Sequence, residues 1–143
     1  MPVKYKIYIK AKTDFVQYSG NYFLIALEIK IRFRYPNTPP FFDDPLKDFV
    51  ISLPVSNETR RVSKDYPRLT FTFPKITDLQ LNKYSLTIEK GLSEFMEFDP
   101  ETNKIYINVA NLPTSKFGQY KIKVLLQDEL GAYWREQFNI NIN

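Results

Sequence analysis

Apolar and polar residues alternate along most of this 143-residue chain, and no other feature constrains its fold as strongly. A period of two places the apolar side chains on one face of an extended strand, whereas a helix needs apolar spacings of three and four. The pattern therefore predicts an all-β fold, with turns at the glycines and prolines between the alternating segments. These segments are residues 3–12, 22–34, 68–73, 83–89, 105–109, 120–126 and 132–143, and the turn expected between the first two is Asp14–Asn21.

The composition excludes several kinds of chemistry. The chain contains neither cysteine nor histidine, so thiolate nucleophiles, imidazole acid–base catalysis, Ser-His-Asp triads and the usual Cys/His zinc sites are absent. No apolar run approaches the roughly 20 residues that a membrane helix needs, and lysines interrupt the first ten residues, where a signal peptide is apolar. We therefore expect no enzyme of these classes and no membrane span in this chain.

The net charge of +4 is concentrated near the N-terminus. Residues 1–36 hold seven lysines and arginines against two acidic residues, whereas residues 37–143 hold 13 against 14. Alternation places the lysines on one strand face, which favours a solvated face that discourages edge pairing; docking of an acidic glycan or protein is the alternative. No nucleic-acid partner is expected, because no aromatic–basic RNA-binding signature, glycine-rich clamp or recognition helix accompanies the charge.

An internal repeat indicates how the chain is divided. The segment YKIYIKA from Tyr5 matches YKIKVLL from Tyr120, and the strand that follows each segment matches in pattern. Each pair predicts a β-hairpin. The stiff connector YPNTPPFFDD follows the first hairpin, so we predict that residues 1–36 are the last two strands of a preceding, incomplete repeat. Residues 37–143 would then be a complete domain.

The equivalence of the two hairpins extends to the residues that end their leading strands. Asp14 is expected to end the first strand as Asp128 ends its counterpart. These residues lie nine and eight positions after Tyr5 and Tyr120, so the match is displaced by one residue.

Short motifs follow one another in order through the second part: Phe98-Asp99-Pro100 with Thr102, the strand Ile105–Val109, Gly118-Gln119-Tyr120, and a closing hairpin with Asp128 and Gly131. With the connector Asn37-Thr38-Pro39-Pro40-Phe41, this order resembles the cadherin-like repeats of the dystroglycan type. The resemblance implies an immunoglobulin/cadherin-like Greek-key β-sandwich, preceded by a β-hairpin from a second, incomplete repeat.

The residues before the connector depart from calcium-binding cadherins. Those proteins carry an acidic run there, because Ca²⁺ prefers several carboxylate oxygens. Here Arg32 and Arg34 occupy that place and would repel the ion. Asp43, Asp44 and Asp48 could supply carboxylates, but a solvated loop is the favoured interpretation. We expect no cofactor, with calcium as the one alternative.

Three local motifs predict structure or modification. Asp99 and Pro100 predict a tight turn, because Pro100 presets φ and Asp99 can bond its own backbone two residues on. Tyr120, two residues after Gly118 at the start of a strand, predicts a structural tyrosine corner. Asn57-Glu58-Thr59 is an N-glycosylation sequon, with Asn57 as the candidate acceptor. If Asn57 is glycosylated, the protein is extracellular or on the cell surface.

The leading hypothesis is a non-enzymatic module of a tandem array that acts as a spacer, adhesive element or fibre subunit. A two-stranded hairpin is not stable alone, so its partner strands would come from the second domain or from another chain, and in the latter case subunits would assemble head to tail. Partners would be neighbouring repeats or copies of the chain. The interface candidates on the hairpin are Tyr5, Ile7, Ile9, Phe23, Ile25, Leu27, Ile29 and Ile31.

A carbohydrate-binding sandwich is the alternative function. Tyr133 and Trp134 are the candidate sugar platform, together with Tyr8 and Tyr18, although packing in the core explains Trp134 as well. An enzyme is the third possibility, because Glu94, Glu97, Asp99 and Glu101 could form a carboxylate pair. Their turn setting is explained by the fold, so no catalytic residue is expected.

Overall fold

The computed structural model describes the backbone of residues 7–18, 21–33 and 36–143 and the side chains of residues 36–143. The chain divides into two compact units, Met1–Pro36 and Asn37–Asn143. The elements are β1 (Ile7–Tyr18), β2 (Asn21–Phe33), β3 (Phe41–Phe42), β4 (Phe49–Ile51), β5 (Leu69–Thr72), β6 (Ile76–Thr77), β7 (Tyr84–Lys90), β8 (Met96–Asp99), β9 (Lys104–Ile107), the 3-10 helix η1 (Thr114–Lys116), β10 (Gly118–Asp128) and β11 (Tyr133–Ile142).

The first unit is an antiparallel hairpin of β1 and β2. Its ladder runs from the pair Ile7 and Phe33 to the pair Tyr18 and Asn21. Among the described residues, β1 and β2 pair only with each other. The outer edge of each strand therefore has no sheet neighbour within this unit.

The predicted turn over Asp14–Asn21 is wrong, and so is the prediction that Asp14 ends its strand. β1 continues to Tyr18, and the ladder shifts register between Asp14 and Phe15. Residues 13–18 continue the strand with mostly β-branched and aromatic residues, which strands favour, and the register shift leaves Ile25 of β2 without a partner in the ladder. Gly20 lies outside the described residues.

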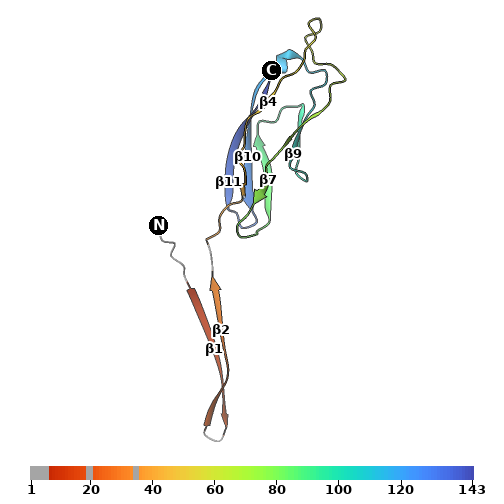
Figure 1. Cartoon of the computed structure of the whole chain (residues 1–143). Helices are drawn as coiled ribbons and strands as arrows, with labels where there is room; N and C mark the ends of the chain where they lie inside the picture. The colour runs from red at the N-terminus through yellow and green to blue at the C-terminus, as the bar shows by residue number, and fades with distance from the viewer. Residues whose placement is uncertain (1–6, 19–20, 34–35) are drawn as a thin grey trace. The chain divides into compact units, whose positions relative to one another are not determined.

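The second unit is a β-sandwich (Figure 1). One sheet has the strand order β4-β11-β10-β7, with β4 parallel to β11 and the other pairs antiparallel. The facing sheet has the order β5-β9-β8, and β3 and β6 form a short ladder of their own. The predicted all-β sandwich preceded by a hairpin is confirmed. That the hairpin belongs to a preceding repeat stays a prediction.

The core consists of the apolar positions of the alternating segments. Ile122, Val124 and Leu126 of β10 pack with Ile105 and Ile107 of β9, and all five side chains are fully buried. Burial of each such side chain contributes about 1.5–3 kcal/mol. The alternation in the sequence therefore identifies the face of each long strand that points into the sandwich.

Phenylalanines fill the space between the sheets around Phe73. Its ring lies 5.1 Å from that of Phe71, 5.7 Å from Phe138, 5.8 Å from Phe42 and 5.9 Å from Phe98. Three of these four pairs are edge-to-face, which is a favoured aromatic geometry. This cluster joins β3, β5, β8 and β11.

Four short strands, β3, β4, β6 and β8, were not predicted. β3, β4 and β6 have two or three residues, too few to show a period of two. The four residues of β8 were assigned to the stretch that leads into the Asp99 turn. β4 is held to the sheet partly by Asp48, whose carboxylate accepts hydrogen bonds from the backbone N and the Nδ2 of Asn139. These bonds lower the pKa of Asp48. Asp48 therefore anchors β4 beside β11, where a solvated loop had been predicted.

Candidate functional site

One end of the sandwich, here called the connector end, consists of Asn37 and the loops 78–82 and 128–132. Asp78 begins the first loop and is 4% exposed. Its Oδ1 accepts hydrogen bonds from the backbone N–H groups of Gln80 (2.9 Å) and Asn82 (3.1 Å). A carboxylate that accepts hydrogen bonds from two backbone N–H groups of its own loop stabilises the conformation of that loop.

Asp128, at the end of β10, organises the second loop in the same way. It is 5% exposed, and its Oδ1 accepts bonds of 2.9 Å from the backbone N–H groups of Leu130 and Ala132. Both loops thus begin with a buried aspartate that bonds the second and fourth residues after it. This shared design makes both loops well-defined parts of the surface.

Asn37 links these loops to the connector. Its Nδ2 donates a 2.6 Å hydrogen bond to Asp128 Oδ2, and its Oδ1 accepts a 2.8 Å bond from Asn82 Nδ2. One side-chain amide thus bridges the loop after β10 and the loop before β7. We call the bonded set Asn37, Asn82 and Asp128 the amide bridge.

Two further contacts hold the same end together. The backbone N and the Oγ1 of Thr38 both donate to Gln80 Oε1, at 3.1 and 2.9 Å. Lys83 donates its backbone N–H to Glu129 Oε1 and accepts the Glu129 N–H at its carbonyl. The connector and both loops therefore form one hydrogen-bonded unit.

Three exposed leucines lie on these fixed loops. Leu79 is 65% exposed, Leu81 91% and Leu130 68%. Leu81 has a φ of 59°, a left-handed backbone that leucine rarely adopts. Single exposed apolar side chains are common on protein surfaces, so these leucines by themselves define no interface.

The donor chemistry of the connector end does not fit a calcium ion. Ca²⁺ takes six to eight oxygen ligands. Asp128 already accepts three N–H hydrogen bonds and Asp78 Oδ1 accepts two. Among the described residues of this end, Asp78 Oδ2 is the one buried carboxylate oxygen without a hydrogen-bond partner. Within the described residues, no three acidic side chains gather closely enough to hold a metal.

The tight turn predicted at Asp99 has the expected bonds. Its Oδ1 accepts the Glu101 N–H and its Oδ2 accepts the Thr102 hydroxyl, which lowers the pKa of Asp99. Of the other acidic residues weighed for catalysis, Glu94 forms a 3.0 Å salt bridge with Lys116, and Glu97 lies on β8. Bonds within its own turn occupy Asp99, so the structure assigns this carboxylate to the fold.

Tyr120 lies near the start of β10 and bonds the loop before it. Its hydroxyl donates a 2.5 Å hydrogen bond to the carbonyl of Lys116, four residues earlier. Its ring packs edge-to-face on Phe95 at 5.4 Å. This is the type of contact that a tyrosine corner makes. Its contribution to stability stays a prediction.

Tyr133 and Trp134 do not share a face. In the β10–β11 ladder, Trp134 pairs with the buried Leu126 and Tyr133 pairs with the exposed Gln127. Successive side chains of a strand point to opposite faces, so the two rings cannot form one flat platform. Tyr133 instead lies beneath the guanidinium of Arg135, 4.8 Å from its ring centre.

The remaining predicted residues lie in two places. Asn57 is exposed in the turn 57–59. Tyr5 lies outside the described residues. The strands of the other hairpin candidates are described but their side chains are not, namely Ile7, Tyr8, Ile9, Tyr18, Phe23, Ile25, Leu27, Ile29 and Ile31.

Sequence reasoning identified the connector but missed the loop 78–82. Asp78 and Asn82 carry no family motif, and Asp128 was assigned only to the closing hairpin, as the end of its first strand and the start of its turn. The available signal was that each aspartate begins a short polar turn between two strands. It could not show that both turns meet Asn37.

Solved structures similar to this chain include cadherins. The human desmocollin-1 ectodomain matches 75% of this chain, with 14% identity and a TM-score of 0.50, and human mucin-like protocadherin EC1-2 matches 97%, with 10% identity and a TM-score of 0.50. This chain covers 84% of the mucin-like protocadherin structure, but only 20% of the desmocollin-1 structure and 22% of one of protocadherin gamma B2. No protein-family model and no curated protein matches the sequence.

At this level of identity, the likeness shows the fold alone: the second unit is a cadherin-like β-sandwich. Among the described residues, no helix is long and apolar enough to cross a membrane.

Proposed function

We propose that this chain is a non-enzymatic structural or adhesion module of a tandem cadherin-like array, and that its hairpin pairs with another molecule by strand addition. The observation behind the proposal is that β1 and β2 pair only with each other among the described residues. An isolated two-stranded hairpin is marginally stable in water. Its two outer edges also present unpaired backbone donors and acceptors, which are a template for a further strand.

The hairpin sequence supports the proposal, because its apolar pattern indicates a face that another layer covers. Apolar residues occupy alternate positions along β2, from Phe23 to Phe33, apart from the shift at the bulge. Such a face is stable only when another layer covers it. Copies of this chain are the proposed partners, and addition of the hairpin of one copy to the sandwich of the next gives head-to-tail assembly.

The connector end supports a mechanical role. The amide bridge and the Thr38–Gln80 bonds fix the connector to two loops of the sandwich without a metal ion. Fixed attachment limits bending where the chain enters the domain. An array built this way would resist bending at that point without calcium.

An extracellular or cell-surface location is part of the same proposal. The cadherin-like fold is typical of cell-surface arrays, and Asn57 stands exposed in its turn, as a glycosylation acceptor must. Occupancy of Asn57 would place the protein in the secretory pathway.

The test is sedimentation velocity of the whole chain over a hundredfold concentration range, with electron microscopy of the concentrated sample. We expect concentration-dependent oligomers or filaments. Ile29→Lys places a charge on the hairpin and should shift the protein to monomer. Leu81→Lys, which alters an exposed leucine of the sandwich, is the matched control and should leave assembly unchanged. A wild-type monomer at every concentration would contradict the proposal.

The carbohydrate alternative loses support at the aromatic pair, because Tyr133 and Trp134 point to opposite faces of β11. An enzyme is not favoured, because Asp99 serves its own turn and Glu94 pairs with Lys116.

A further inference from the structure

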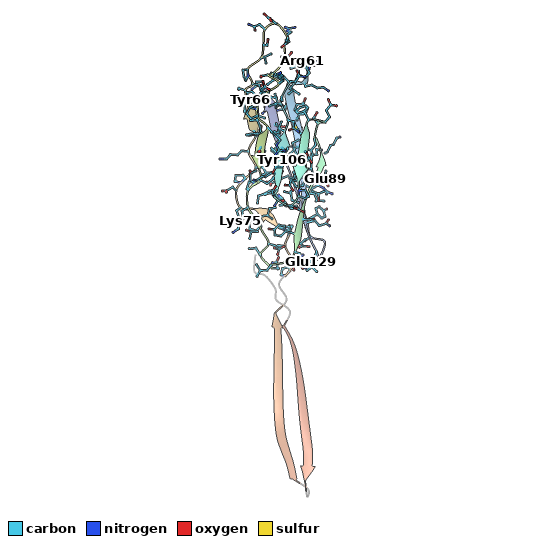
Figure 2. The ribbon with its side chains drawn as sticks, turned by 90° about the vertical axis from the view of Figure 1, so that its right-hand side faces the viewer. Arg61, Tyr66, Lys75, Glu89, Tyr106 and Glu129 are labelled. Atoms are coloured by element: carbon cyan, nitrogen blue, oxygen red, sulfur yellow. The ribbon has the colours of Figure 1, made fainter. Side chains whose placement is uncertain are left out.

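The end of the sandwich opposite the connector end contains a groove. Figure 2 places Arg61 at this end and Glu129 at the other. The groove has a volume of about 610 Å³ and lies between the loop 54–64 and Asn111. This volume is within the range of small-ligand sites, about 300–1,000 Å³.

The backbone of the groove is fixed by two loops that bind each other. Val62 donates its N–H to the Leu112 carbonyl (3.0 Å), and Asn111 donates to Ser63 (3.1 Å). Val62 is 2% exposed, so it anchors this wall in the core. The groove is therefore a defined part of the fold.

Two backbone positions at the groove adopt left-handed conformations. Arg60 has a φ of 53° and Asn111 a φ of 58°. Such a conformation costs free energy in arginine, whereas asparagine adopts it more readily, and strained positions often occur at functional sites. Both residues lie where the loops 54–64 and 109–114 meet, since Thr114 donates its N–H to the Arg60 carbonyl.

The side chains that line the groove are rich in hydrogen-bond donors. Arg61 and Lys64 bring two positive charges, and no acidic residue lines the groove. One Arg61 nitrogen, Nη1, donates to the Asn111 carbonyl at 3.0 Å, which orients the guanidinium. Arginine has five N–H donors, so others remain for a ligand.

Two serines add donors of a particular kind. Ser56 Oγ accepts the Thr59 N–H, and Ser63 Oγ accepts the Asp65 N–H. Each hydroxyl oxygen is therefore engaged as an acceptor, while its hydrogen is free to donate. A ligand with many acceptor oxygens and negative charge would satisfy both serines and both cations at once.

From this arrangement we infer that the groove binds an acidic saccharide, through a sulfate or carboxylate group held by Arg61 and Lys64. Charge-assisted and bidentate bonds to oxyanions are the strongest that these side chains form. The volume exceeds that of one oxyanion, and Thr59 and Asn111 offer polar groups for sugar hydroxyls. The sequence Arg60-Arg61-Val62-Ser63-Lys64 has the clustered cations of polyanion-binding surfaces.

The test uses the full chain and a sulfated oligosaccharide, with the desulfated, uncharged oligosaccharide as the ligand control. We expect binding of the sulfated form by isothermal titration calorimetry, with affinity that falls as salt rises. The double variant Arg61→Gln/Lys64→Gln should weaken binding by about tenfold or more, because two charged contacts are lost. Lys75→Gln/Lys83→Gln removes the same charge from two other exposed positions and should change affinity less than twofold.

Further measurements determine which part of the chain binds the saccharide. NMR shifts on titration should localise to Ser63 and Asn111, and inorganic sulfate should compete weakly at the same signals. Equal loss in both double variants would overturn the inference, because binding would then reflect net charge. Loss of binding only in Lys10→Gln/Lys12→Gln would also overturn it, because the saccharide would then bind the hairpin. Tighter binding of an acidic peptide than of the saccharide would overturn it as well. Assembly of copies is a separate readout, so failure of either proposal leaves the other intact.

Discussion

Asn37 and Asp128 lie 91 residues apart in the sequence, yet Asn37 Nδ2 donates a 2.6 Å hydrogen bond to Asp128 Oδ2. The same amide accepts a bond from Asn82, so one side chain joins the connector to two loops. The bridge therefore ties the start of the second unit to both loops through side-chain amide and carboxylate groups.

The bridge predicts the effect of Asn37→Ala. The substitution removes the two hydrogen bonds of the Asn37 side chain, and Oδ2 of the buried Asp128 loses the bond that Asn37 donates. The free energy of unfolding should therefore fall by about 1–2 kcal/mol. Urea denaturation measures this loss. Added calcium should not restore the lost stability, and Asn57→Ala, in an exposed turn, is the control with no expected effect. Full stability of Asn37→Ala would show that the bridge contributes nothing.

Two glycines with positive φ should respond differently to alanine. Gly91 has a φ of 107°, and a Cβ there would collide with the carbonyl oxygen of Lys121. Gly131 has a φ of 93° but open space around it. Gly131→Ala should therefore cost only the backbone strain, about 1–2 kcal/mol, whereas Gly91→Ala should cost several kcal/mol or prevent folding. Comparable thermal midpoints for the two variants would be evidence against the close approach at Gly91.

Removal of one hydroxyl tests the contact between Tyr120 and Lys116. Tyr120→Phe deletes the hydrogen bond and keeps the ring on Phe95, so unfolding free energy should fall by about 1 kcal/mol. Tyr133→Phe, on an exposed side chain, should change stability by much less. Chemical denaturation of both variants makes the comparison, and equal values would assign no structural role to the Tyr120 hydroxyl.

Glu136 predicts a pH dependence of stability. Burial raises the pKa of Glu136, opposed by a hydrogen bond from Trp134, and its Oε2 has no partner. The folded state therefore binds the Glu136 proton more tightly than the unfolded state does. The stability that this proton contributes is fully present below the unfolded-state pKa of about 4.3, and it is lost as the pH rises through the folded-state pKa.

Glu136→Gln is neutral at every pH and imitates the protonated form. Its thermal midpoint should exceed that of the wild type at pH 7, and the difference should shrink towards pH 4. Glu97→Gln, on an exposed strand position, provides the control for charge removal. A difference that does not depend on pH would contradict the assignment to the burial of Glu136.

The parts of the fold that the sequence predicts are the long strands, in which apolar and polar residues alternate over many positions. The inward face of β10 is visible as Ile122, Val124 and Leu126, because a period of two maps directly onto the faces of a strand. The turn at Asp128–Gly131 was also visible, because aspartate and glycine favour turns. Short strands such as β4 were not, since three residues show no period and their pairing depends on long-range contacts such as Asp48 with Asn139.

The same limit applies to the sites. Asn37 was recognised as part of the connector, but its partners come from loops 45 and 91 residues away, and no local pattern predicts such distances. Tyr133 and Trp134 show the converse, because neighbours in sequence were grouped as one platform although a strand separates them onto two faces. The groove at Arg61 depends on Asn111, fifty residues away, and was likewise not predicted.

The central claim is that the hairpin β1–β2 is completed by another molecule, and amide hydrogen exchange at several protein concentrations tests it most directly. The account predicts that protection of β1 and β2 amides rises with concentration towards that of β10 and β11, because outer-edge N–H groups become bonded in the assembly. Ile29→Lys should abolish that rise. Exchange from the hairpin that is rapid and identical at every concentration would contradict the account.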